Sequence, residues 1–176
     1  MEQHVFVDES KARDFLLIAS VMLHAGVTAA RRDVRALVLP GQRRIHMKTE
    51  SDARRRVLLS KFEEFGFTAT IFRAGAAHKR ELDRREACLR QLVAQLAGGG
   101  DTILCLESDE TLDDRDRRQL YGFARDAGCA ERLRYHHARA AQEPLLAVPD
   151  VIGWAWAKGG DWRRRTDGLV VDVVEV

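Results

Sequence analysis

The chain has few cysteines and no long apolar run, and both shortages limit the kind of protein it encodes. Its three cysteines, Cys88, Cys105 and Cys129, are widely spaced and form no C-x-x-C pair, which excludes a disulfide framework and a zinc–cysteine cluster. No apolar stretch approaches the roughly 20 residues of a membrane span, and no signal-peptide pattern opens the chain. We therefore expect a cytoplasmic protein with reduced core thiols and no membrane partner.

Lysine and the common catalytic motifs are also scarce. Lysine occurs at only five positions and the net charge is +2, so the basic side chains are nearly all arginine. Arginine clusters can bind phosphates, but charged runs usually lie on solvated helix faces, and we favour that interpretation for any single cluster. No P-loop, G-x-S-x-G, H-E-x-x-H or Rossmann glycine pattern is present. The clusters are residues 31–32, 43–44, 54–56 and 163–165.

The apolar pattern predicts a mixed sheet covered by helices. A length of 176 residues with 45% hydrophobic and 32% charged content is typical of one globular domain, assigned here to residues 1–160. Residues 161–176 are interpreted as a C-terminal extension whose valine-rich end forms an extra edge strand. Residues 45–48 are predicted to be extended, and Thr49 and Thr111 to begin helices. The predicted strands are 4–8, 15–23, 67–72, 102–106 and 133–136, and the predicted helices are 27–39, 49–65, 78–97, 112–127 and a last one containing Asp150.

Acidic side chains follow two of the predicted strands. The first strand ends at Asp8 and Glu9, and the strand 102–106 leads into Glu107 and Asp109. Since side chains alternate along a strand, Asp8 and Glu9 should point to opposite faces. Ligands of open α/β sheets collect outside the carboxyl ends of strands, which would bring Asp8 and Glu107 together. The alternative is that residues 108–111 are only a polar turn before a helix.

Asp150 lies in an otherwise apolar helical stretch, on one stripe with Leu146 and Trp154. A carboxylate among core residues costs several kcal/mol unless it is protonated, paired or bound to metal. A structural alternative is a capping role near the helix N-terminus. His46 and Lys48 would share a face of an extended segment and contact a phosphate or transfer a proton, unless they are simply exposed.

Three short segments, taken in order, resemble domain-of-unknown-function family 3800. Residues 5–10 match an opening strand that ends in Asp-Glu-Ser-Gly, with Lys11 in place of the glycine. Residues 144–155 resemble a closing helix of the form Leu-Gln-x-Ala-Asp-x-x-Ala, and residues 44–48 resemble a middle element around a histidine. Members usually carry an aspartate where this chain offers Glu107 or Asp109. The resemblance covers residues 4–158 and implies a ribonuclease-H-like fold.

The expected fold is a ribonuclease-H-like α/β sheet of three antiparallel strands followed by two parallel ones, with helices on both faces. The expected activity is hydrolysis of phosphodiester bonds in RNA, DNA or a hybrid with bound magnesium or manganese (Mg²⁺ or Mn²⁺). The alternative is an inactive module of the same fold that binds nucleic acid or a protein. We also expect a homodimer through the C-terminal strand. The expected metal ligands are Asp8, Glu107 and Asp150, with Asp109 and Glu9 in reserve, and His46 and Lys48 at the phosphate.

Overall fold

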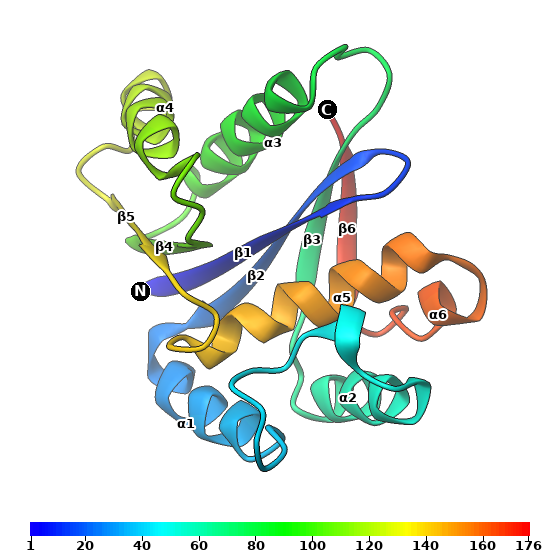
Figure 1. The fold of residues 1–176 in the computed structure, drawn as a ribbon. Helices are drawn as coiled ribbons and strands as arrows, with labels where there is room; N and C mark the ends of the chain where they lie inside the picture. The colour runs from blue at the N-terminus through cyan, green and yellow to red at the C-terminus, as the bar shows by residue number, and fades with distance from the viewer.

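A six-stranded sheet forms the centre of the protein, which a computed structural model describes over residues 1–176 (Figure 1). The order across the sheet is β5-β4-β1-β2-β3-β6. The first three strands pair antiparallel, β4 and β5 run parallel to β1, and β6 runs parallel to β3. The predicted arrangement of three antiparallel strands and two parallel ones is therefore confirmed. The strands are β1 (Gln3–Lys11), β2 (Phe15–Leu23), β3 (Ala69–Ala74), β4 (Thr102–Glu107), β5 (Leu133–Ala138) and β6 (Val170–Glu175).

Helices cover both faces of the sheet, as predicted (Figure 1). One apolar cluster joins Phe6 and Cys105 to α1, α2 and α5, and the other joins Val7 and Leu104 to α3 and α4. This division follows from the alternation of side chains along each strand. The helices are α1 (His24–Arg35), α2 (Asp52–Glu64), α3 (Glu81–Leu96), α4 (Asp113–Asp126), α5 (Ala147–Lys158) and α6 (Gly160–Arg164), with short 3-10 helices η1 (Met47–Thr49) and η2 (Pro144–Leu146).

Helix α5 packs directly against the middle of the sheet. Seven of its twelve residues are buried, which explains why the sequence around Asp150 is so apolar. A Cβ atom at Gly153 would lie 2.6 Å from Cδ1 of Ile18 on β2, so only glycine allows this close approach. The contact fixes how near the first turn of α5, which carries Asp150, comes to the ends of the central strands.

Three local predictions were wrong. Residues 45–48 are not an extended piece, because the 3-10 helix η1 begins at Met47. Helix α2 is capped by Ser51, whose hydroxyl accepts a hydrogen bond from Arg54 N at 3.2 Å, and not by Thr49. Thr111 does not cap α4, since it donates to the carboxylate of Asp109 instead. In each case a side chain that the capping pattern did not predict accepts the backbone N–H: Asp150 at Met47, Ser51 at Arg54 and Asp109 at Thr111.

The three cysteines are free and buried, as predicted from their spacing. Burial raises the pKa of both Cys88 and Cys105 to about 12, so their thiols stay protonated at neutral pH. The valine-rich C-terminal segment forms β6 at the edge of the sheet beside β3. None of the helices combines the length and the apolar character needed to cross a membrane.

Candidate active site

The carboxyl ends of β1 and β4 place Asp8 and Glu107 next to each other. These strands are parallel neighbours, with Phe6 opposite Cys105 and Val7 opposite Leu106. Asp8 and Glu107 come one step after Val7 and after Leu106, on the face covered by α5. Asp150 lies in the first turn of that helix, and its charge acts on Asp8 together with that of Glu107. Segments far apart in the sequence thus bring three carboxylates to one edge of the sheet.

Asp8 is the centre of this carboxylate group. Burial, and then the negative charges of Asp150 and Glu107, raise the pKa of Asp8 well above its usual value. One favourable contact opposes them, because the Glu9 backbone N–H donates to Asp8 Oδ1 at 2.8 Å. An ionised Asp8 is therefore held at a free-energy cost that a nearby cation would reduce.

Glu107 and Asp150 each have a partner of their own within the chain. Arg44 Nη1 donates to Glu107 Oε1 at 2.7 Å. Asp150 Oδ2 accepts the Met47 backbone N–H at 2.9 Å, and Oδ1 lies 3.3 Å from His46 Nδ1. The two side-chain groups with three ligand atoms all within 4.8 Å of one another lie elsewhere in the fold. These partners fix the positions of Glu107 and Asp150 beside Asp8.

Asp150 is paired with groups outside its own helix and does not take the capping role that the sequence left open. It stands in the first turn of α5, where a negative charge is favourable, yet its carboxylate does not cap its own helix. It accepts instead from the first residue of η1, whose backbone is buried. This hydrogen bond turns the chain at Met47 and directs His46 toward the carboxylates.

Two hollows meet at Asp8. His46 and Lys48 line one of them together with Asp150 and Trp154, although their segment is not extended. Glu107 and Asp109 line the other. Apart from Glu9, the side chains expected at the site therefore lie around Asp8, with Lys48 exposed to solvent.

The two reserve ligands have other contacts. Glu9 points to the face opposite Asp8, as predicted, where Arg85 Nε donates to it at 2.9 Å and Lys11 Nζ lies 3.2 Å away. Asp109 accepts from the backbone N–H and the hydroxyl of Thr111 at 3.0 and 2.7 Å. These two hydrogen bonds lower the pKa of Asp109. The polar-turn interpretation therefore describes Asp109 well.

A buried ionic network behind Glu9 was missed at the level of sequence. Arg85 Nη2 donates to Asp116 Oδ2 at 2.9 Å, and His137 Nε2 lies 2.9 Å from the same oxygen. Burial raises the pKa of Asp116, but hydrogen bonds from His137 and Arg85 outweigh it and lower the pKa overall. The predicted strand 133–136 ends just before His137, and no local pattern predicts the network, because the meeting of α3, α4 and β5 depends on packing.

Two of the arginine clusters contain half-buried arginines that stabilise the fold, which the solvated-face interpretation did not predict for them. Arg31 binds Glu143 through two nitrogens, and Arg54 Nη2 donates to the backbone oxygen of Leu37. Arg55 donates to the backbone oxygen of Met47 and lies 4.2 Å from the ring centre of Trp154. These arginines support the segments that carry His46 and Asp150.

The donor set at Asp8 fits a hard divalent cation. Carboxylate oxygens are the protein ligands that Mg²⁺ and Mn²⁺ prefer, and no sulfur competes with them here. Burial, and then the negative charges of Asp150 and Glu107, raise the pKa of Asp8, so a cation bound there would favour its ionised form. The residues present therefore suit such an ion, which would compete with Arg44 for Glu107.

Comparison with solved structures identifies the fold. The chain is similar to ribonuclease HII in the structure of the PCNA:RNase HII complex from Archaeoglobus fulgidus, with a TM-score of 0.60 and 16% sequence identity. The match covers 89% of this chain and 73% of that chain. No family model matches the sequence, and no curated protein does. The mixed sheet with its helices is a ribonuclease-H-like fold.

Proposed function

We propose that the protein is a divalent-metal-dependent nuclease that hydrolyses phosphodiester bonds of nucleic acid. The observation that carries the proposal is the convergence of Asp8, Glu107 and Asp150 at the carboxyl ends of β1 and β4. These carboxylates would hold one or two ions of Mg²⁺ or Mn²⁺. A bound ion of this kind lowers the pKa of a coordinated water and stabilises charge on a phosphoryl oxygen.

The protein's own side chains have distinct tasks in this reaction. His46 is oriented by Asp150 through Nδ1, which leaves Nε2 to exchange a proton with the substrate or a water molecule. Lys48 is exposed beside the same hollow and offers a positive charge to the phosphate. Glu9 and Asp109 remain reserve ligands in this proposal.

The surface next to the site suits a phosphodiester backbone. Beyond Ala12, a third hollow is lined by basic side chains, including the exposed Arg13 and Lys158. Arg163 lies 4.1 Å from the ring centre of Trp156 at the same place. Basic groups interleaved with aromatic rings bind single-stranded nucleic acid through phosphates and base stacking.

Manganese-dependent cleavage of a panel of RNA, DNA and hybrid substrates tests the proposal. We expect wild type to cleave at least one of them, and Asp8→Asn and Asp150→Asn to lose activity by on the order of 100-fold or more. His136→Ala, which changes an exposed side chain of β5, serves as the control and should retain activity. Undiminished cleavage by Asp150→Asn would refute its assignment.

A second candidate function is a binding module with the same fold and no catalysis. The observation in its favour is the 2.7 Å contact between Arg44 and Glu107, which already neutralises one expected ligand. Calorimetric titration with Mg²⁺ and Mn²⁺ separates the two candidates. If neither ion binds at millimolar concentration, the binding module is favoured.

Three further expectations stay predictions. They are membership of domain-of-unknown-function family 3800, a cytoplasmic location and a homodimer through β6. The last follows from the place of β6 at the edge of the sheet, where its outer backbone groups have no strand partner. Light scattering across a range of concentrations measures whether a dimer forms.

A further inference from the structure

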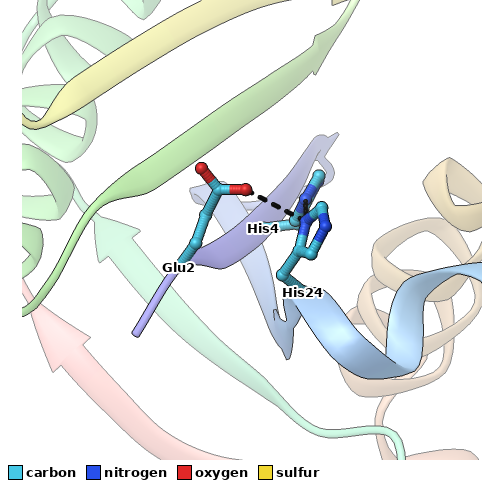
Figure 2. Close-up of side chains that lie close together, drawn as sticks. All are labelled: Glu2, His4 and His24. Atoms are coloured by element: carbon cyan, nitrogen blue, oxygen red, sulfur yellow. Dashed lines mark hydrogen bonds and ion pairs between the residues drawn. The ribbon is translucent and has the colours of Figure 1, made fainter.

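A second group of ligand side chains lies at the opposite end of β1 from Asp8. Figure 2 shows the Glu2 carboxylate and the imidazole rings of His4 and His24 directed toward one another. His4 Nε2 lies 2.9 Å from His24 Nδ1, and His24 Nδ1 lies 3.0 Å from Glu2 Oε1. One ligand atom from each residue lies within 4.8 Å of the other two.

The backbone builds this group from two segments. Glu2 directly precedes β1 and His4 is the second residue of that strand, so the two side chains, two residues apart in extended chain, project from the same face. The His24 backbone N–H donates to Glu2 O at 3.0 Å, which continues the pairing of β1 with β2 and fixes the first residue of α1 beside them. The rings of His4 and His24 stack with their centres 5.1 Å apart.

Hydrogen bonding alone satisfies these three atoms poorly. If His24 Nδ1 carries a proton, Glu2 Oε1 and His4 Nε2 must share that one donor. If His4 Nε2 carries the proton instead, the lone pair of His24 Nδ1 accepts it and has nothing to offer the Glu2 carboxylate 3.0 Å away. A cation between them would accept all three lone pairs at once.

We propose that Glu2, His4 and His24 form a binding site for a divalent transition-metal ion, with zinc as the first choice. Two imidazoles and one carboxylate are a known set of protein ligands for zinc with an open fourth position. Zinc–nitrogen bonds of about 2.0–2.1 Å place tetrahedral ligand atoms roughly 3.3 Å apart. The two short contacts of 2.9 and 3.0 Å are close to that separation.

The surroundings orient the ligands and leave one side open. Arg134 binds the other oxygen of Glu2 and so directs Oε1 toward the imidazoles. Arg31 lies near His4, and Glu143 holds its guanidinium. The His24 side chain is 63% exposed, so the fourth position faces solvent. A bound ion would clamp the start of β1 to the start of α1.

This site is separate from the carboxylates at Asp8. Glu2 and Asp8 are six residues apart along an extended chain, which corresponds to roughly 20 Å. Its nitrogen ligands also suit a different class of metal from the oxygen-only group. The proposal therefore does not depend on the proposed nuclease activity.

Zinc titration of tag-free, chelator-stripped protein by calorimetry tests the site. We expect wild type to bind one zinc ion here and His24→Ala to lose affinity by on the order of 100-fold. His24 is exposed at the start of a helix where alanine is well tolerated, so this variant should fold. His136→Ala removes an exposed histidine elsewhere and should bind zinc as wild type does.

Cobalt(II) gives an independent measurement on the same proteins. We expect the visible bands of a tetrahedral cobalt site in wild type and His136→Ala, and their loss in His24→Ala. The proposal is overturned if wild type binds no zinc, or if His24→Ala and His136→Ala bind it equally. It is also overturned if zinc binding survives in His24→Ala and is lost in Asp8→Asn, because the ion would then lie at the carboxylates.

Discussion

The two ends of β1 carry groups with different donor atoms on the same face of the strand. At the carboxyl end, Asp8 meets Glu107 and Asp150, which are all oxygen ligands. At the amino end, His4 meets His24 and Glu2, which supply mostly nitrogen. Burial raises the pKa of Asp8 and lowers the pKa of His4, so at each end it disfavours the charged form of the side chain.

The two proposed sites on this strand would therefore take different kinds of ion. An ionised Asp8 is destabilised by like charges, which a hard cation would neutralise. His4 is kept neutral, which leaves ring nitrogens able to donate lone pairs to a borderline ion such as zinc. The comparison therefore predicts that the two ends respond to different metals and to different substitutions.

The largest expected effect is that Asp8→Asn loses most of the stabilisation by Mn²⁺, whereas His24→Ala loses the stabilisation by zinc. Mn²⁺ should raise the Tm of wild type and of His24→Ala, but much less that of Asp8→Asn, because ligands of the folded state add stability only where they bind. Zinc should raise the Tm of Asp8→Asn but not of His24→Ala. A loss of affinity of about 100-fold corresponds to about 2.8 kcal/mol. Thermal melts with each ion measure these changes in Tm. If one variant lost the rise in Tm with both Mn²⁺ and zinc, the two sites would not be separate.

Two substitutions of Asp150 should separate its structural contact from its charge. Asp150→Ala leaves the buried Met47 N–H without an acceptor, which costs about 1–3 kcal/mol of unfolding free energy. Asp150→Asn keeps an oxygen for that N–H and removes one negative charge near Asp8, so metal-free stability should equal or exceed that of wild type. Urea unfolding in chelator measures both. Equal destabilisation by the two would mean that the charge itself, through His46, holds η1 in place.

Asp8→Asn should stabilise the metal-free protein in a pH-dependent way. Since the folded-state pKa of Asp8 is raised, the folded protein binds this proton more tightly than the unfolded chain does. The contribution of Asp8 to the stability of wild type therefore falls as pH rises from about 3.9, the unfolded value, through the folded pKa. The variant lacks this decline and should gain about 2–4 °C in Tm near neutral pH, with no gain at pH 3.5. A gain of the same size at every pH would point to packing instead of charge.

The smallest expected effect concerns Arg44. Its ion pair with Glu107 is about one-third exposed on both sides, so Arg44→Gln should change stability by only about 0.5 kcal/mol. Freed from this partner, Glu107 should bind a cation more readily, with Mn²⁺ affinity rising about threefold. Zinc affinity at the other end of β1 should not change. Calorimetry on the same preparation measures both ions, and a fall in Mn²⁺ affinity would mean that Arg44 positions Glu107 for binding.

Much of the fold was readable from local pattern. The apolar run of β1 and the alternation that separates Asp8 from Glu9 depend on neighbouring residues alone. The sequence also pointed to Glu107 at the end of a strand and Asp150 in an apolar helix. The local structure could not be predicted where a distant side chain binds the backbone. At Met47, for example, the backbone N–H donates to a side chain 103 residues away.

The local sequence pattern predicted the order of strands and helices and the acidic side chains that follow the first and fourth strands. Hydrophobic periodicity spans only a few neighbouring residues, so it can be recognised in the sequence without knowledge of distant contacts. Three contacts depend instead on packing: His24 with His4, Arg44 with Glu107, and His137 with Asp116. These contacts join residues 20 to 63 positions apart, and their distances follow from how α1, α4 and the segment before η1 pack on the sheet.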